Sequence, residues 1–424
     1  MKMINGWKAL LVASTFAGTG LAAPTHAQTQ AHACIEGLGM GSQQIWWTGG
    51  NSGKYLMDFT AGAPVLSNAG IGQTGSFEGT AVYTTPAGEL LLYTDGDSIF
   101  NGQNNTQIGT GVGGDPSATE AALIVPDPAG SPTNDFYVFG NTGNTSGPIN
   151  YTLVDIAANS IDPITPLDGG VVFSESLATV PHANGFDFWI ISVTNASPAV
   201  NAYEVTASGV NNTPVSSSIP SLPSGTAAHR GTVVYHPPTG RLAIGFYSES
   251  TNQGHILTAR FDESTGTASD FELHATGELG YGVAFSPDGS KLYYSVGTQG
   301  FNGSITHYDL ASDTATPIDT GAWAMPRLAP DNNVYVVDFG ATTMGVIQSP
   351  NTDPAGIGWD ANGITLPEGS TAAYSLVNQT YAPCEILNEP APPLAVTVPT
   401  LNHLGLFVLL LLAGLMPLML GRRI

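Results

Sequence analysis

A proline-based turn motif recurs through the middle of this chain of 424 residues, and it restricts the possible folds more than any other feature. Its prolines, spaced by 42, 53, 56, 50 and 43 residues, stand at positions 86, 128, 181, 237, 287 and 330. Proline presets φ at the first corner of a tight turn, and a following Asp-Gly or Asn-Gly supplies its left-handed position. The motif therefore predicts six related hairpins.

A short apolar or alternating run follows each turn, and such runs closed by turn residues are typical of β-strands. The six runs are Leu90–Thr94, Phe136–Phe139, Phe188–Val193, Leu242–Phe246, Leu292–Val296 and Val334–Val337. No helical periodicity appears between residues 35 and 382. Short strands repeating every ~50 residues indicate propeller blades of four strands each, and about 350 residues allow seven. We expect an all-β, seven-bladed β-propeller over residues 28–386.

The first 27 residues predict a secretory signal peptide. Lys2 and Lys8 form a basic start, a small-residue apolar stretch follows, and Ala27 ends a small-residue cleavage site. The apolar stretch is too short and too diluted by Gly, Ser and Thr for a membrane anchor. We therefore expect export through the Sec route.

The other end of the chain predicts a membrane-spanning helix behind a stiff spacer. Residues 387–397 are rich in proline. Residues 404–420 carry no charge, and 17 residues make about 25 Å of helix, just enough to span a bilayer. Arg422 and Arg423 then hold the C-terminus in the cytoplasm, so the bulk of the chain lies outside.

The motif ahead of this helix carries a family resemblance. It reads Val398-Pro399-Thr400-Leu401, with Gly405 four residues after the leucine. With the apolar helix and the arginine pair, residues 398–424 resemble the IPTL-CTERM sorting tail, although Val replaces Ile and Asn-His-Leu replaces Ser-Glu-Trp. The resemblance implies that an exosortase-type sorting protease cleaves the tail and passes the protein towards the cell surface. A permanent single-span anchor is the alternative.

Ring closure is the main demand that a propeller makes on its ends, because open first and last blades would expose sticky edges. We expect N- and C-terminal strands to share a blade, with residues 45–47 pairing near residues 374–381. Cys34 and Cys384 are the two cysteines, one on each side of the propeller region. In an oxidising space they predict a disulfide that clamps the ring, worth near 5 kcal/mol in chain entropy. Two unrelated buried thiols are the alternative.

The charge balance excludes two classes of partner. Ten Lys and Arg residues face 33 Asp and Glu residues, for a formal net charge of −23. Nucleic-acid binding requires cations that displace phosphate counterions. Adhesion to an anionic membrane surface needs a basic patch for the same reason. Neither class fits this chain, so its only expected membrane contact is the C-terminal helix.

One loop offers a candidate metal site. Asp95 and Asp97 place two carboxylates two residues apart, and Ca²⁺ takes such oxygen ligands. The EF-hand pattern does not continue, since Ile99 and Phe100 follow. The alternative is that Asp95 simply caps a β-turn with its side chain.

Candidates for catalysis are candidates by residue type only. A carboxylate pair facing across a channel would suit glycan cleavage, but spacing along the chain does not show which acids face each other, so Glu78, Asp95, Glu120 and Glu175 are named by type. His182 and His236 lie in equivalent turns, which favours hairpin hydrogen bonding over catalysis. The Gly-x-Ser-x-Gly motif of serine hydrolases does not occur, and no phosphate-binding loop is complete. The sequence therefore assigns no catalytic or cofactor-binding residue.

The middle of the chain carries a second resemblance, on an ordered set of motifs. Its clearest members are Phe77–Ala81, Leu91–Gly96, Phe285–Tyr293 and Leu328–Asp331. The set is similar to the WD40-like and YVTN-type propeller region of large bacterial sorted surface proteins, including gliding-motility-associated ones. This resemblance implies a surface propeller and supplies no catalytic residues.

The expected function is therefore binding or display at the cell envelope or surface. The propeller would act as a non-catalytic binding or adhesion module for an extracellular polysaccharide or protein. An alternative is a propeller enzyme, a glycan hydrolase or lyase with channel carboxylates and possibly Ca²⁺. A second alternative is a structural component of a matrix or surface layer.

Overall fold

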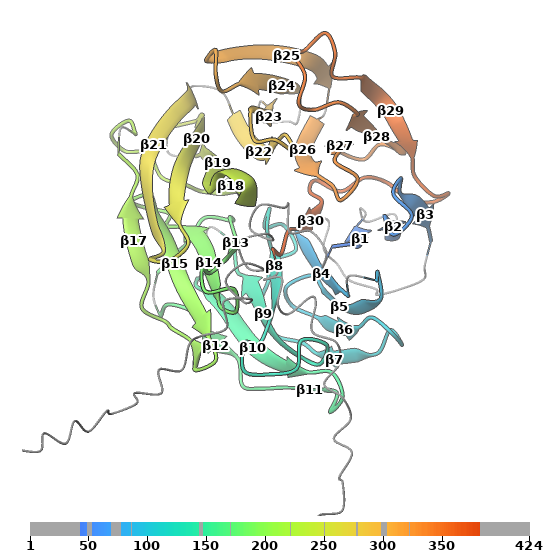
Figure 1. Cartoon of the computed structure of the whole chain (residues 1–424), viewed down its shortest axis with the longest axis vertical. Helices are drawn as coiled ribbons and strands as arrows, with labels where there is room; N and C mark the ends of the chain where they lie inside the picture. Colours follow the sequence, from blue (N-terminus) through green and yellow to red (C-terminus); the bar gives the residue numbers. More distant parts are fainter. Residues whose placement is uncertain are drawn as a thin grey trace, which may run out of the picture. The chain divides into compact units, whose positions relative to one another are not determined.

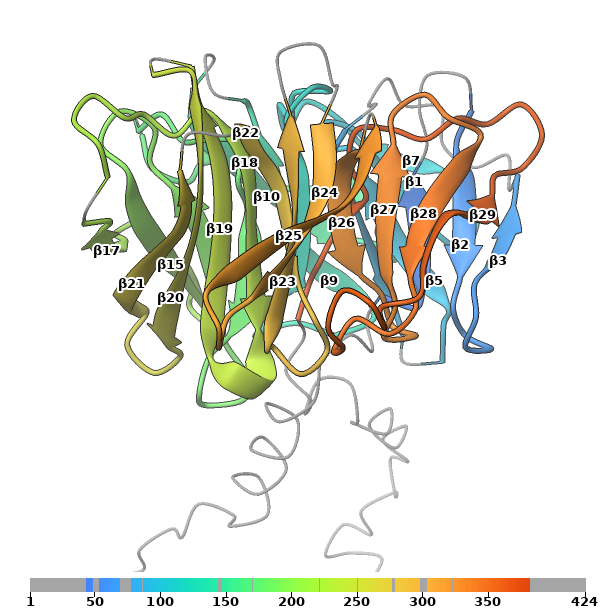
Figure 2. The ribbon, with the colours of Figure 1, turned by 90° about the horizontal axis from the view of Figure 1, so that it is seen from above.

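The computed structural model describes residues 43–381 apart from 49–52, 69–77, 86, 144–146, 170, 221, 250, 277–278, 298–302 and 322. The strands form seven sheets placed around a common axis, which confirms the seven-bladed β-propeller (Figure 1). In each blade the first strand lies nearest the axis and the later strands lie further out (Figure 1). From the side, the blades stand next to one another as upright walls (Figure 2).

The first three blades come from residues 45–166. The first is β1 (Ile45–Thr48), β2 (Tyr55–Asp58) and β3 (Val65–Ser67). The second is β4 (Thr80–Thr84), β5 (Leu90–Thr94), β6 (Ile99–Asn101) and β7 (Gln107–Gly109). The third is β8 (Ala122–Pro126), β9 (Asp135–Asn141) and β10 (Ile149–Asp155), with β11 (Ser160–Ile161) and β12 (Thr165–Pro166) both paired to β10.

Four more blades complete the ring. The fourth is β13 (Ala178–Pro181), β14 (Phe188–Val193) and β15 (Ala199–Thr206), which pairs with β16 (Gly209–Val210) and β17 (Val215–Ser218). The fifth is β18 (Arg230–His236), β19 (Arg241–Ser248), β20 (Gln253–Asp262) and β21 (Thr267–Thr276). The sixth is β22 (Leu279–Phe285), β23 (Lys291–Gly297), β24 (Gly303–Asp309) and β25 (Thr314–Gly321). The seventh is β26 (Trp323–Leu328), β27 (Val334–Asp338), β28 (Thr343–Ile347) and β29 (Trp359–Thr365).

All copies of the proline motif occupy the same place in their blades. Each copy joins the first strand of a blade to its second, and each predicted run lies in that second strand. In the fifth blade the turn is η2 (Pro237–Thr239), a 3-10 turn closed by Gly240 at φ 60°. Gly289, in the next copy, has φ +69°, and a Cβ there would lie 2.7 Å from the His236 ring. Neighbouring turns thus pack on each other, and glycine is required at that contact.

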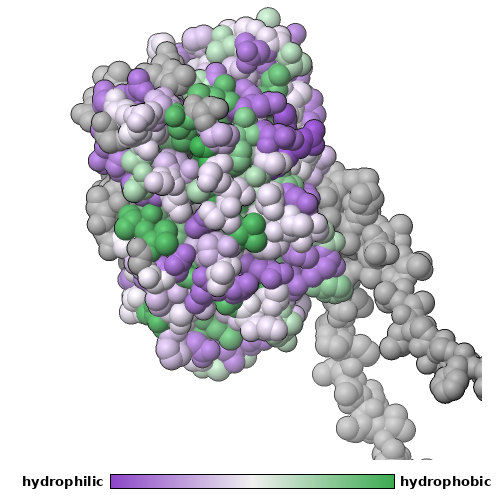
Figure 3. Space-filling model, turned by 90° about the vertical axis from the view of Figure 1, so that its left-hand side faces the viewer, coloured by the Kyte–Doolittle hydropathy of each residue, from purple (hydrophilic) through white to green (hydrophobic). Residues whose placement is uncertain are grey.

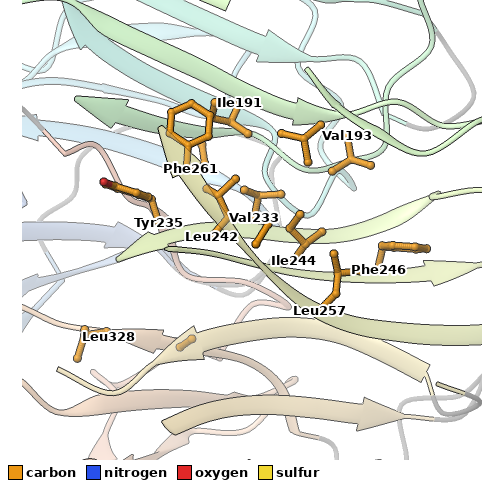
Figure 4. Packing of buried hydrophobic residues seen from close by; sticks show 14 of the residues in the cluster. Ile191, Val193, Val233, Tyr235, Leu242, Ile244, Phe246, Leu257, Phe261 and Leu328 are labelled. Atoms are coloured by element: carbon orange, nitrogen blue, oxygen red, sulfur yellow. The ribbon is translucent and has the colours of Figure 1, made fainter. Parts of the chain in front are cut away.

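The core consists of side chains packed between blades. Val233 and Tyr235 of β18 belong to one buried cluster with Ile191 of the fourth blade and Leu328 of the seventh (Figure 4). Strands such as β5, β8 and β14 are buried on both faces, because each blade is covered by a neighbour on either side. This explains why their sequences read as continuous apolar runs.

The ring closes by packing between the first and seventh blades. Trp46 is fully buried, and its ring lies edge-on to Tyr335 at 6.1 Å between centroids. The Tyr55 hydroxyl contacts the Met344 sulfur at 3.7 Å. Aromatic area of this kind contributes strongly to packing energy. The described strands of the first blade are all N-terminal, so this closure uses side chains where a shared sheet was expected.

The C-terminal strand corrects the prediction about its position. β30 (Val377–Asn378) does not join the sheet of β1; it runs parallel to β4, on the side facing the axis. Figure 1 shows β30 at the centre of the ring. The physical reason lies in its polar side chains, which reach the inner edges of several blades at once. We call residues 375–381 the axial segment.

Several predicted features lie outside the described residues. They are the signal peptide, the spacer, the helix over 404–420, the motif from Val398 to Gly405, Arg422 and Arg423, and the two cysteines Cys34 and Cys384. These remain predictions. Within residues 43–381 as described, no helix is long and apolar enough to cross a bilayer. On the side of the ring drawn in Figure 3, hydrophobic residues form separate groups among polar ones.

Candidate functional site

Three of the four acids singled out in the sequence meet at one end of the ring axis. Glu78 precedes β4 by two residues, Glu120 precedes β8 by two, and Glu175 precedes β13 by three. Inner strands of successive blades run in the same direction, so residues just before them gather at one end. Backbone hydrogen bonds confirm the contact: Glu120 N donates to Glu175 O at 3.0 Å, and Glu175 N donates to His229 O at 2.9 Å.

Glu120 is the deepest of the three and serves the structure. It is fully buried, and its Oε2 accepts hydrogen bonds from the backbone N–H groups of Leu177 at 2.8 Å and Val233 at 3.1 Å. Its Oε1 lies 3.2 Å from Nη2 of Arg327, which is also buried. Burial raises the pKa of Glu120 to about 7, against the opposing charge of Arg327. This one carboxyl group therefore links four blades.

Glu175 lies nearer the surface, between a threonine and an exposed arginine. Its Oε2 accepts hydrogen bonds from the N–H of Thr119 at 3.0 Å and from its hydroxyl at 2.7 Å. Its Oε1 lies 3.9 Å from Nε of Arg230, and Nη2 of Arg230 lies 2.7 Å from Oε1 of Glu249. Burial raises the pKa of Glu175 to about 7. The Arg230 side chain is 46% exposed, so this side of the cluster meets solvent.

Glu78 is the third member of the cluster. Its Oε2 accepts a hydrogen bond from the Tyr281 hydroxyl at 3.0 Å. The pKa of Glu78 is well above its ordinary value, first because the group is buried and second because Glu175 carries like charge nearby. Burial also raises the pKa of Tyr281. The protonated form of Glu78 is thereby favoured, which makes it a hydrogen-bond donor.

These groups form what we call the axial site: Glu78, Thr119, Glu175, Arg230 and Tyr281. It combines a guanidinium, two carboxyl groups that change charge near neutral pH or above, a phenol and a hydroxyl. Such a set can bind hydroxyl and carboxylate groups of a ligand, and it can give or take a proton. Among the described residues, no group of three or more His, Cys, Asp or Glu side chains could hold a metal ion.

Asp95 follows β5 at the same end of the blade as the start of β4, and it caps a turn. Its Oδ1 accepts hydrogen bonds from the N–H groups of Asp97 at 3.0 Å and Ser98 at 2.7 Å. Asp97 accepts hydrogen bonds from Gly113 N at 3.1 Å and the Thr110 hydroxyl at 2.9 Å. These contacts support the turn-cap interpretation. The Ca²⁺ site at Asp95 and Asp97 stays a prediction, and the described residues place no third His, Cys, Asp or Glu side chain there to complete a metal-binding group.

The two turn histidines have the structural role that their position indicates. His182 Nδ1 accepts a hydrogen bond from the N–H of Asn184 at 3.0 Å. His236 Nδ1 lies 2.9 Å from Oγ1 of Thr239, and its Nε2 lies 3.0 Å from the carbonyl oxygen of Pro287. Burial lowers the pKa of His236, so its neutral form is favoured. Both side chains therefore hold hairpins.

Sequence reasoning missed four important partners: Thr119, Arg230, Tyr281 and Arg327. Two of them left a usable signal. Arg327 stands in the apolar run of an inner strand, and a charge there requires a buried partner. Arg230 is one of few cations in a strongly acidic chain. Thr119 and Tyr281 left no signal, because threonine and tyrosine are ordinary strand residues.

The axial segment occupies the axis beside this cluster. Residues 375–381 are at most 4% exposed. The Thr48 hydroxyl donates to the carbonyl oxygen of Ser375, and Tyr381 N donates to the Thr179 hydroxyl at 2.9 Å. The Tyr381 ring lies edge-on to Tyr235 at 6.0 Å between centroids. The segment thus touches blades on several sides of the ring.

Comparison with known proteins identifies no family for this chain. No protein-family model matches the chain, and no curated protein matches it. Among solved structures, a protein from Lactobacillus plantarum is 16% identical, with a TM-score of 0.48 over 78% of this chain and 98% of that one. A 6-phosphogluconolactonase-like protein from Bacteroides fragilis is 11% identical, with a TM-score of 0.48 over 78% and 96%. TolB from Acinetobacter baumannii is 13% identical, with a TM-score of 0.34 over 72% and 76%.

Proposed function

We propose that this protein is a non-catalytic binding and display propeller, held at the cell envelope or surface, that contacts an extracellular polymer through the axial site. The observation that carries the proposal is the partly exposed Arg230, set beside buried carboxyl groups at an axis that the axial segment fills. A ligand there meets a fixed polar surface at the end of the ring.

The hydrogen bonding at the site favours binding over turnover. Glu120 is used by two amides and Arg327, and Glu175 is used by Thr119 and Arg230. Groups held this firmly are pre-organised for recognition, which lowers the entropy cost of binding. A guanidinium beside hydroxyl and carboxyl groups suits a polysaccharide that carries hydroxyl and carboxylate groups.

Co-sedimentation with a panel of neutral and uronic-acid polysaccharides tests the proposal. We expect binding that falls at least ~10-fold in Arg230→Ala, because a charge-assisted contact is lost. Arg260→Ala is the matched control, since Arg260 lies in the same blade on β20, is 64% exposed and pairs with Asp270. Equal loss in both variants, or binding by neither parent nor variants, would overturn the axial site as the binding surface.

The cellular location of the protein is a separate part of the proposal. It rests on the predicted signal over residues 1–27 and the sorting tail over 398–424. The intact mass of the protein from its host's envelope tests it. A mass that ends near Thr400 means that a sorting protease removes the tail. A mass that includes residues 404–424 means a permanent anchor and a search among envelope partners.

One observation favours a second candidate function, cleavage of a glycan. Glu78 has a raised pKa and lies beside Tyr281 and near Glu175, as a general acid beside a second carboxyl group would. Incubation with the polysaccharides that bind distinguishes the two functions. Shortened chains that disappear in Glu78→Gln, with folding retained, establish an enzyme; unchanged chain length supports the binder.

A further inference from the structure

In the described part of the chain, the inner edges of the blades carry backbone groups that lack a strand partner, and the axial segment bonds to several of them. Among the described strands, the first strand of every blade except the second has a sheet neighbour on one side only, so its other edge points backbone groups at the axis. Such edges can accept an added strand, as in recognition by β-augmentation. One strand can pair with one edge, and here β30 pairs with β4 through Val377 and Asn378.

Side chains of the axial segment bind the edges that its backbone does not reach. The Asn378 side-chain amide donates to the carbonyl oxygens of Ala122 at 3.0 Å and Leu177 at 2.5 Å. The Thr380 hydroxyl donates to the carbonyl oxygen of Ile124 at 2.7 Å. These two residues satisfy three carbonyl groups on two blades, which a hydrophobic residue of similar size would leave unpaired.

Two further residues extend the contact to other blades. The Gln379 side-chain amide donates to the carbonyl oxygen of Leu328 at 2.6 Å, in the seventh blade. The side-chain oxygen of Gln379 accepts a hydrogen bond from the Tyr381 hydroxyl at 3.0 Å. The side chains of the sequence Asn-Gln-Thr-Tyr therefore determine how the segment is recognised, chiefly through hydrogen bonds to backbone carbonyl groups of the ring.

The chain before the axial segment is exposed and can be cut. Glu368 and Gly369 are exposed, and Gly369 has φ +82° with no atom within 4 Å of an added Cβ. The segment itself is buried. A break in this loop would separate the segment covalently from β29 without touching its contacts.

We propose that the ring axis is a binding site for an extended peptide of sequence Asn-Gln-Thr-Tyr, filled in cis by residues 375–381, and that the same sequence binds there in trans. The ring is the receptor and its own C-terminal segment is the ligand. This inference does not rest on the proposed function.

Cleavage of the intact chain tests the proposal. A protease-recognition sequence is placed between Glu368 and Gly369 in the full chain, with Cys384→Ser so that no disulfide can retain the fragment. We expect the cut fragment to co-elute with the ring in the absence of denaturant. A labelled synthetic peptide of residues 370–382 should then replace it, at one peptide per ring.

The matched control is the same peptide with Asn378→Leu and Thr380→Val. It loses donors to three carbonyl groups, so we expect binding weaker by ~10-fold to 100-fold. Equal competition by both peptides would overturn the proposal. Immediate release of the fragment from a ring that stays folded would overturn it as well.

If cutting unfolds the ring, hydrogen exchange of the uncut chain gives the answer. Asn378→Leu should speed exchange in residues 375–381 while β20 and β21, in the outer part of the fifth blade, keep their protection. Faster exchange of the same size in all of these strands would mean that Asn378 supports the fold as a whole, and the proposal would fail.

Discussion

Glu120 and Glu175 occupy similar places in neighbouring blades, yet their surroundings differ. Glu120 is sealed inside the ring with Arg327 and two backbone amides. Glu175 sits one layer nearer the solvent, with Thr119 on one oxygen and the exposed Arg230 near the other. Depth along one axis thus turns the same residue type into a structural link in one blade and a candidate recognition group in the next.

The largest expected effect comes from breaking the deep pair. Arg327→Met leaves the Glu120 carboxylate buried without its ion partner, and such a loss costs about 3–5 kcal/mol of unfolding free energy. Urea denaturation measures it. Adding Glu120→Gln to the same chain should recover much of the loss, because both charges are then gone and the amide oxygen can still accept from the N–H groups of Leu177 and Val233. A cost under about 1 kcal/mol for Arg327→Met alone would show that the pair carries little of the stability.

The raised pKa values of the two carboxyl groups predict the next effect, a dependence of stability on pH. Both have a folded-state pKa of about 7, against an ordinary value of 4.5, so the folded chain holds extra protons between these values. Stability is therefore greatest below pH 4.5 for these groups and falls by about 1 kcal/mol per group and pH unit up to pH 7. Glu175→Gln should flatten this slope in denaturation curves recorded from pH 4.5 to 7. An unchanged slope in that variant would assign the whole effect to other groups.

A subtler change targets the threonine that holds Glu175. Thr119→Val removes the hydroxyl donor at 2.7 Å and keeps the N–H donor at 3.0 Å. The charged form of Glu175 loses a hydrogen bond, so its pKa should rise further, and about 1–2 kcal/mol of unfolding free energy should be lost. A ¹³C NMR titration of the glutamate carboxyl groups measures the pKa. Movement of the Glu120 resonance alone would contradict the assignment.

The smallest effect is expected outside the axis, at Asp95. Asp95→Ala removes the acceptor for two turn amides and should cost about 1 kcal/mol, while Asp95→Asn keeps an acceptor and should cost less. Thermal unfolding with and without Ca²⁺ checks the calcium prediction on the same proteins. A rise of Tm with Ca²⁺ that Asp97→Asn abolishes would establish a metal site there.

The sequence was sufficient to predict the blades, but it was not sufficient to predict the contacts at the ring axis. The turn around Pro287 and the run Leu292–Val296 belong to a pattern that repeats along the sequence, and each repeat of that pattern forms one blade. The meeting of Glu120 with Arg327 spans 207 residues and depends on how far each side chain reaches across the ring. The spacing of residues along the chain does not predict how close these two side chains come. The prediction for the strand that contains Asn378 was wrong for a similar reason. Whether this strand pairs with β4 or with β1 depends on carbonyl groups of other blades.

The axial segment also makes the completed ring depend on the last part of the described chain. Every blade strand from β1 to β29 lies before residue 375, and residues 375–381 then bond to the inner strands of several blades. A chain truncated before residue 375 would therefore keep every blade strand and lose these bonds. The carbonyl oxygens of Ala122, Ile124 and Leu328 would then lose the side-chain donors that they have at the axis.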